Sequence, residues 1–449
     1  MTLRCIAATA VVSAAMILGA AIPPAQPRAA PEKILNQRER AELFNSWLDT
    51  RFSVLLPALM RREKIDMWVV ICREHNEDPV YWSLVPQPSM FAWRLTMFVY
   101  ALGDRGVECL SVNRYGSGDL HREFAAIYTP AWEPESLDPW ERLARVIRER
   151  NPKKIAINES RTFAFADGLT ADLKAQLVRA LGPELAARLV SSERLAVGWL
   201  ETRTPEELEF YSRIAALNHQ LIREAFSRKA VTPGKTTIDD LSWWYRERLD
   251  ELNLGTWFRP MFSIVRPGPF DPAKDRVILP GDMLRCDVGV TYMSLQADHQ
   301  EIAYVLRPGE SEAPKGLRQA MVLGNRLQDI LIAEFREGRT GNEILASALA
   351  KAKTEGLAPR IYCHPLGYHG HGAGPRIGLP DMQNGVPGMG DYPLHLDTVH
   401  AIELGIQAKI PEWNDKEIFL PLEQDAALTA KGVAFLDGRQ TEIILIRTD

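Results

Sequence analysis

Cysteine is scarce in this sequence, and long apolar runs are confined to its N-terminus. The five Cys among 449 residues are scattered through the chain. Their number and spacing exclude a disulfide scaffold and a zinc site built from thiolates. Cys72, Cys109 and Cys286 lie in apolar stretches, and they are predicted to pack as small buried hydrophobic side chains.

An excess of positive charge is also missing. The formal net charge is -5 and the isoelectric point is near 6.1, which excludes a typical nucleic-acid-binding protein. Hydrophobic residues make up 46% and charged residues 25% of the chain, as in ordinary globular proteins. The length of 449 residues predicts two domains.

The first 30 residues differ from the rest. Arg4 precedes an almost wholly apolar run from Cys5 to Ile22, and Gly19-Ala20-Ala21 suits a cleavage site. We interpret residues 1–30 as a secretory signal peptide with a spacer, which predicts export to the periplasm, or secretion where the host has no outer membrane. The alternative is an uncleaved anchor, because 18 residues approach the length that spans a bilayer. No later run is as long, so no membrane segment is expected after signal cleavage.

The next segment, residues 31–197, alternates helical and strand patterns. Helices are expected at 32–62 and 140–150, and strands at 67–72, 95–102, 107–112 and 154–158. This alternation predicts an α/β domain. The segment contains no phosphate-binding loop and no nucleophile elbow. Asn76-Glu77-Asp78-Pro79 is a turn whose two carboxylates are predicted to be solvated.

A second domain, residues 198–449, shows an internal repeat. A capping box at Thr204 begins a helix pair that leads through Gly234-Lys-Thr to a cap at Thr237. A second pair, about a hundred residues later, leads through Gly338-Arg-Thr340. Strand signals follow each pair, at 261–265, 283–290 and 297–306, and at 360–363 and 399–406. We expect two α/β halves related by a pseudo-twofold; chance similarity of the two turns is the alternative.

Four carboxylates stand inside or beside the apolar strand runs of this domain. Asp287 and Asp298 lie on two runs that can pair as a hairpin, and Glu403 and Glu442 lie in the runs HAIELGI and TEIILI. Burying a carboxylate is costly unless it is paired or binds a metal. A turn Asp and an Asp paired with an Arg would explain the first two equally well, and Arg439 is a possible partner of Glu442.

The stretch from Cys363 to Gly374, CHPLGYHGHGAG, adds three His among Gly and Pro. His364 and His371 are candidate functional residues, whereas His369 is expected to be an ordinary packed or surface histidine. Four carboxylates close to one imidazole need cations to stay ionised. Two divalent ions would supply this charge, and an oxygen-rich set with one nitrogen suits Mn, Co, Fe or Zn.

The order Asp, Asp, His, Glu, Glu, with D-x10-D and H-x-x-G-x-x-x-H spacings, resembles the pita-bread metallopeptidases. These include methionine aminopeptidase, aminopeptidase P, prolidase and the metal-free creatinase. The resemblance covers residues 200–449, and residues 33–195 resemble the creatinase-type N-terminal domain. It implies an α/β, pita-bread fold and two metal ions, Mn foremost, held by Asp287, Asp298, His364, Glu403 and Glu442. Asp298 and Glu442 would bridge the ions, His371 would contact the substrate, and Glu403 would carry the proton of a metal-bridging hydroxide.

The resemblance therefore predicts a homodimeric Xaa-Pro aminopeptidase or dipeptidase acting on peptides and not on nucleic acid. Two alternatives are a non-catalytic module of the same fold and a creatinase-like C–N hydrolase. Three positions depart from the family pattern. Phe270 and Asp271 stand where a His is usual, Gln440 stands where an Arg is common, and Leu404 replaces a common Pro. These departures concern peptide specificity and leave the predicted ligand set intact.

Overall fold

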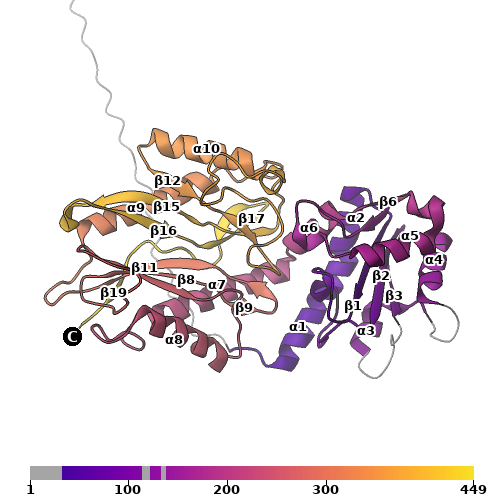
Figure 1. Ribbon diagram of the computed structural model, residues 1–449, viewed down its shortest axis with the longest axis horizontal. Coiled ribbons are helices and arrows are strands. Elements are labelled where there is room, and N and C mark those ends of the chain that lie inside the picture. Colours follow the sequence, from indigo (N-terminus) through magenta and orange to yellow (C-terminus); the bar gives the residue numbers. More distant parts are fainter. Residues whose placement is uncertain (1–32, 114–121, 133–137, 449) are drawn as a thin grey trace, which may run out of the picture. The chain divides into compact units, whose positions relative to one another are not determined.

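The computed structural model describes residues 33–113, 122–132 and 138–448 (Figure 1). The predicted signal peptide, with Cys5, lies outside the described residues. Within these ranges, no helix combines the length and apolar character needed to cross a bilayer. The four cysteines that the structure describes, Cys72, Cys109, Cys286 and Cys363, are buried and unbridged, which confirms the packing predicted for the first three.

The N-terminal region is built on a six-stranded sheet of order β4-β3-β2-β1-β5-β6 (Figure 1). Its strands are β1 (Met67–Arg73), β2 (Leu95–Gly103), β3 (Gly106–Asn113), β4 (Thr129–Pro130), β5 (Ile155–Ile157) and β6 (Leu189–Ser191). Its helices are α1 (Gln37–Thr50), α2 (Leu56–Glu63), α3 (Arg122–Ile127), α4 (Pro139–Arg150), α5 (Ala171–Ala186) and α6 (Glu193–Glu201), with a π-helical turn at Arg51–Leu55. The domain boundary predicted near residue 197 falls within α6.

Strand β1 is apolar from Met67 to Cys72 because both faces of this sheet are covered. Trp68 and Val70 pack into a core with side chains of α1 and α2. Met67 and Val69 point to the other face and pack against α4 and α5. Successive side chains of a strand alternate between faces, so a central strand covered on both sides reads as a continuous apolar run.

The prediction that both carboxylates of the 76–79 turn are solvated is wrong for Asp78. Asp78 is fully buried, and its Oδ1 accepts hydrogen bonds from Val80 N at 3.0 Å and from Asn158 Nδ2 at 2.9 Å. Its Oδ2 is buried without a partner. Burial raises the pKa of Asp78 to about 6. The carboxylate orders the turn through Oδ1 and leaves its second oxygen unsatisfied.

Asp78→Asn is expected to change how stability depends on pH. Because the folded-state pKa is raised, wild-type stability is highest below the unfolded pKa near 4 and is lost as pH rises through about 6. Asn keeps Oδ1 and never ionises. The variant should therefore gain up to about 3 kcal/mol relative to wild type between pH 4 and 7, the free-energy scale of a pKa raised from about 4 to about 6. Urea unfolding at several pH values measures this, with exposed Asp104→Asn as control. An equal difference at every pH would contradict it.

The α-helices of the C-terminal region are α7 (Pro205–Ala225), α8 (Ile238–Glu251), α9 (Lys315–Ile332) and α10 (Gly341–Thr354). The strands of its first half are β7 (Met261–Val265), β8 (Met283–Val288), β9 (Thr291–Tyr292), β10 (Leu295–Gln296) and β11 (His299–Val305). Those that follow α10 are β12 (Pro359–Ile361), β13 (His364–Leu366), β14 (Thr398–Ala401), β15 (Leu404–Ile410), β16 (Lys416–Leu422), β17 (Asp425–Thr429), β18 (Gly432–Phe435) and β19 (Ile444–Ile446).

The two halves repeat the same helix–turn–helix junction in detail. Thr237 and Thr340 cap α8 and α10, each within a capping box. Gly234 and Gly338 have φ of 81° and 83°, a left-handed conformation that favours glycine. Their amides donate to backbone carbonyls of Ile278 and Leu394, in corresponding segments. The internal repeat predicted from the Gly-basic-Thr turns is present in the structure.

The strands of the C-terminal region form three larger sheets, of order β19-β11-β8-β7, β13-β14-β17-β18 and β12-β15-β16. The predicted hairpin of the two Asp runs is observed, since β8 and β11 are antiparallel with Gln300 opposite Asp287. An isolated antiparallel bridge between Gln300 and Glu423 joins β11 to the β16–β17 connection. This bridge brings the two halves of the repeat together at the carboxylates.

Candidate metal centre

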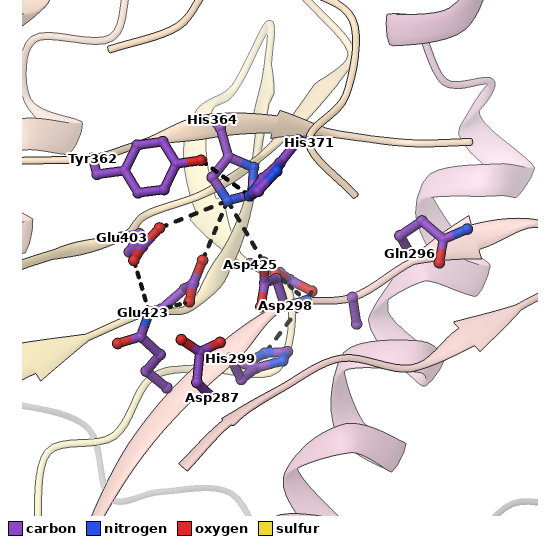
Figure 2. Close-up of polar contacts among 12 residues, drawn as sticks. Asp287, Gln296, Asp298, His299, Tyr362, His364, His371, Glu403, Glu423 and Asp425 are labelled. Carbon is purple, nitrogen blue, oxygen red and sulfur yellow. Dashed lines mark hydrogen bonds and ion pairs between the residues drawn. The ribbon is translucent and has the colours of Figure 1, made fainter. Parts of the chain in front are cut away.

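Asp298, His364 and Glu423 form the centre of the site (Figure 2). Asp298 directly precedes β11, His364 begins β13, and Glu423 lies between β16 and β17. One ligand atom from each residue lies within 4.8 Å of the others, and all three residues are buried. His364 Nε2 is 3.5 Å from Asp298 Oδ2 and 3.4 Å from Glu423 Oε1. Three segments from distant parts of the sequence thus direct a nitrogen and carboxylate oxygens to one point.

The tautomer of His364 leaves Nε2 free to act as a metal ligand. His364 Nδ1 lies 3.2 Å from Pro365 O, an acceptor, so Nδ1 carries the proton and Nε2 presents a lone pair. Burial holds the pKa of His364 well below its usual range, which keeps the ring neutral. His364 Nε2, Asp298 Oδ1 and Glu423 Oε1 are buried atoms without a hydrogen-bond partner. Lone pairs that face one another without a donor suit a cation between them.

Glu403 and Gln300 complete one side of the centre. Glu403, between β14 and β15, places Oε2 at 3.8 Å from His364 Nε2. Gln300 Nε2 donates to Glu403 Oε1 and to Glu423 Oε2, both at 2.8 Å. The amide therefore occupies one oxygen of each glutamate and turns the other oxygen of each toward His364.

Asp287 and Asp425 lie beside the central three residues (Figure 2). Asp287, on β8, accepts from Arg285 Nη2 at 2.9 Å through Oδ2. Asp425, at the start of β17, accepts from the backbone N of Asp298 at 3.2 Å. Asp425 is buried and holds the backbone that carries Asp298, so it acts as a positioning residue behind the centre.

The buried carboxylates of the site would be stabilised in their ionised forms by a positive charge. Burial raises the pKa of Asp298 and Glu423 well above the usual range, and neighbouring carboxylates add to both shifts. Burial and Asp287 together raise the pKa of Glu403 to about 8. Crowded buried carboxylates resist ionisation unless a cation compensates them. A divalent ion among Asp298, His364 and Glu423 would restore the ionised forms, and this donor set of oxygens and one imidazole suits Mn, Co, Fe or Zn.

The structure brings four of the five residues proposed as ligands to this region and does not bring Glu442. Glu442 lies in the bend before β19, an edge strand, and its side chain is exposed. An exposed carboxylate is solvated and needs no metal. Arg439, which the sequence offered as an alternative partner for Glu442, pairs with Asp329 at 2.7 Å instead.

Glu423 occupies the place expected for Glu442, and sequence reasoning missed it. Glu423 stands in the apolar segment IFLPLEQDAAL, which meets the same criterion that selected Glu403. Pro421 interrupts that segment, and a Pro within an apolar run argues against a central strand. Here β16 pairs only with β15, as an edge strand that accommodates the proline.

His371 lies next to the centre, with Tyr362 and Arg376. The rings of His371 and His364 are perpendicular, with centroids 4.7 Å apart. His371 Nε2 and Tyr362 Oη share a hydrogen bond of 3.0 Å, and Arg376 Nη1 donates to Tyr362 Oη at 3.4 Å. Burial lowers the pKa of His371 to about 4, so it is neutral at pH 7. Sequence reasoning found His371 but passed over Tyr362 and Arg376.

The loop that carries His371 is held from several sides. Tyr368 donates to Glu207 Oε1 at 3.1 Å, and Glu207 forms a fully buried ion pair of 2.9 Å with Arg51. The ring of His369 stacks on Phe165 with centroids 4.2 Å apart, which agrees with the packed histidine expected there. A Cβ at Gly370 would lie 2.1 Å from the ring of Trp257, so only glycine fits there. These contacts position His371 beside the centre.

An α/β fold with an N-terminal domain and a repeated C-terminal region around a buried carboxylate–imidazole centre is that of a pita-bread metallopeptidase. Residues 209–437 match the model of Metallopeptidase family M24, and the chain belongs to this family.

Solved structures show the same fold. The chain resembles an X-Pro aminopeptidase from Thermotoga maritima with a TM-score of 0.61 at 15% identity, covering 86% of this chain and 99% of that one. An Xaa-Pro dipeptidase from Bacillus anthracis gives 0.57 at 15% identity, covering 91% and 100%. The N-terminal domain of the FACT complex subunit SPT16 from Cicer arietinum (chickpea) gives 0.50 at 13% identity, covering 91% and 98%. A search of curated proteins found no match.

Proposed function

We propose that this protein is a dinuclear-metal-dependent peptidase that hydrolyses Xaa-Pro bonds, as an aminopeptidase or a dipeptidase. The observation that carries the proposal is the buried set of Asp298, His364 and Glu423, in which Asp298 Oδ1, His364 Nε2 and Glu423 Oε1 lack hydrogen-bond partners. Asp287 and Glu403 complete the proposed ligand set, with Glu423 in the place first given to Glu442. When bound by these residues, the metals, with Mn foremost, would polarise the scissile carbonyl and supply a nucleophilic water.

The remaining steps belong to the protein's own side chains. Glu403, which is partly exposed and lies 3.8 Å from His364 Nε2, is placed to take a proton from the attacking water and pass it to the departing amine. Arg376 donates to Tyr362 Oη, which leaves the phenol proton free to point toward His371 or a substrate oxygen. Burial keeps the pKa of Tyr362 above its usual range, so the phenol stays protonated. Tyr362 and His371 can thus stabilise charge that develops on the carbonyl oxygen.

Arg376 supports the dipeptidase form of this proposal. Its side chain is buried, and among the residues that the structure describes it forms no ion pair with a carboxylate. A buried guanidinium without a counter-ion is costly and suits an incoming anion. The free carboxylate of an Xaa-Pro dipeptide has this chemistry. A longer peptide or an amide would leave Arg376 without it.

The test is hydrolysis of matched peptides by protein loaded with Mn. We expect cleavage of Xaa-Pro dipeptides, with kcat/KM at least about tenfold lower for the Xaa-Pro amides, the scale of one charge-assisted hydrogen bond. Xaa-Ala dipeptides serve as the comparison for proline. Equal cleavage of Xaa-Ala and Xaa-Pro would refute the proline preference and leave the peptidase proposal standing. Equal cleavage of acids and amides would refute the dipeptidase form.

Metal content and peptide cleavage, measured on the same protein, distinguish two alternative functions from the proposed one. The fold itself does not select a peptidase, since a FACT subunit domain shares it. A non-catalytic module or a creatinase-like C–N hydrolase has no need of bound divalent ions. Elemental analysis that finds no metal after dialysis against Mn, together with no peptide cleavage, would favour these alternatives over the proposed function.

A further inference from the structure

Arg285 is a positive charge placed beside one proposed ligand. Arg285 and Asp287 are two residues apart on β8, so their side chains emerge on the same face of the strand. Arg285 Nη2 donates to Asp287 Oδ2 at 2.9 Å, and both side chains are partly exposed. Nε of Arg285 is buried without a partner. The guanidinium of Arg285 is therefore hydrogen-bonded to Asp287, the carboxylate that a second metal ion would use.

Gln300, like Arg285, donates a hydrogen bond to a carboxylate on this side of the centre. It lies directly opposite Asp287 across the β8–β11 pair. Its Nε2 donates to Glu423 Oε2, so the oxygen of Glu423 that is turned away from His364 already accepts a hydrogen bond. Protein donors thus satisfy Asp287 Oδ2 and Glu423 Oε2. By contrast, Asp298 Oδ1, His364 Nε2 and Glu423 Oε1 have no such partner.

We propose that Arg285 is an internal counter-ion that competes with the second metal ion for Asp287 and sets the affinity for that ion. This inference rests on the proposed metal-dependent function. An ion at Asp298, His364 and Glu423 meets free lone pairs. An ion that used Asp287 Oδ2 would have to displace the guanidinium, and an ion on Oδ1 would still lie near it. Like charges repel at such short distances, so Arg285 would oppose an ion in either place. The second ion binds only once metal is abundant, so Arg285 couples completion of the centre to metal supply.

The experiment is a Mn titration of the demetallated full chain, followed by calorimetry and by elemental analysis after equilibrium dialysis. Wild type is compared with Arg285→Met, which keeps the chain length and removes the charge. Arg447→Met, an exposed arginine just after β19, controls for net charge. We expect Arg285→Met to tighten binding of the second ion by about tenfold or more, the scale of a hydrogen bond to a charged group. Affinity for the first ion should stay within about threefold.

Electron paramagnetic resonance gives an independent readout. The signal of two spin-coupled Mn ions should appear at a lower Mn concentration in Arg285→Met than in wild type or in Arg447→Met. Arg285→Lys, which keeps the charge, should stay close to wild type. Arg285→Gln, which also removes the charge, replaces Arg285→Met as the test variant if circular dichroism shows that Arg285→Met does not fold.

The failures of the two proposals differ. Second-ion affinity that is unchanged or weaker in folded Arg285→Met or Arg285→Gln overturns the role of Arg285, while metal binding itself persists. Absence of any bound Mn in every variant, wild type included, overturns the metal-dependent function on which the inference rests.

Discussion

Replacing Glu423 with Gln is expected to remove most bound metal and most activity. The Glu423→Gln change keeps the shape of the side chain and removes its charge. Glu423 is buried, faces His364 Nε2 at 3.4 Å through Oε1 and accepts from Gln300 through Oε2. In the proposed dinuclear centre, a carboxylate in this central place would contribute to the binding of both ions. We expect Mn affinity to fall by about a hundredfold or more, the scale of a lost charge-assisted contact of about 3 kcal/mol.

Activity should fall further than affinity. Metal ions contribute several kcal/mol to transition-state stabilisation, so loss of the centre should lower kcat/KM by on the order of 10³-fold. Saturating Mn should restore only part of this activity. The measurements are elemental analysis after dialysis and steady-state hydrolysis of an Xaa-Pro dipeptide across a range of Mn concentrations.

Glu442→Gln is the matched control for this prediction. It makes the same chemical change at the glutamate that the sequence pattern selected, but at an exposed position before β19. Its metal content and kcat/KM should stay within about twofold of wild type, as for most exposed substitutions. Loss of metal in Glu442→Gln with retention in Glu423→Gln would reverse the assignment and restore the ligand set inferred from sequence.

The contrast between Glu423 and Glu442 shows which of the proposed ligands could be predicted from the sequence alone. Asp298 and His364 could be found from local sequence patterns. Asp298 begins an apolar strand run and His364 begins a Gly-rich stretch, and in such places a carboxylate or an imidazole indicates a functional role. Glu403 and Glu442 satisfy one and the same local criterion. Only the pairing of strands distinguishes Glu403, which lies at the junction of two sheets, from Glu442, which is exposed in the bend before the edge strand β19.

Residues whose role depends on the register between two strands could not be predicted from the sequence for the same reason. Gln300 lies opposite Asp287 only because β9 and β10 occupy the connection between β8 and β11 and set how the two strands pair. The alternative that one Asp is paired with an Arg also holds, since Arg285 binds Asp287. Asp78 was expected in solvent because turns usually lie at the surface. Tertiary packing against Asn158 buries it instead.

His371→Ala is expected to lower kcat by about 10²-fold or more, the scale of losing one transition-state hydrogen-bond partner. The ring stands perpendicular to His364 and shares a hydrogen bond with Tyr362, but among the described residues it is not part of the group able to hold a metal. Bound Mn should therefore stay within about twofold of wild type. KM should change little, because the ring acts on charge that develops during the reaction.

The pH profile and one control sharpen this prediction. Burial lowers the pKa of His371 to about 4, so the ring is neutral throughout the range from pH 6 to 8. The loss in kcat should then be the same at pH 6 and pH 8. His369→Phe, two residues away, keeps an aromatic ring over Phe165 and should retain kcat within about threefold. A loss confined to pH 6 would instead indicate that His371 acts as a charged acid, and a loss of metal would make it a ligand.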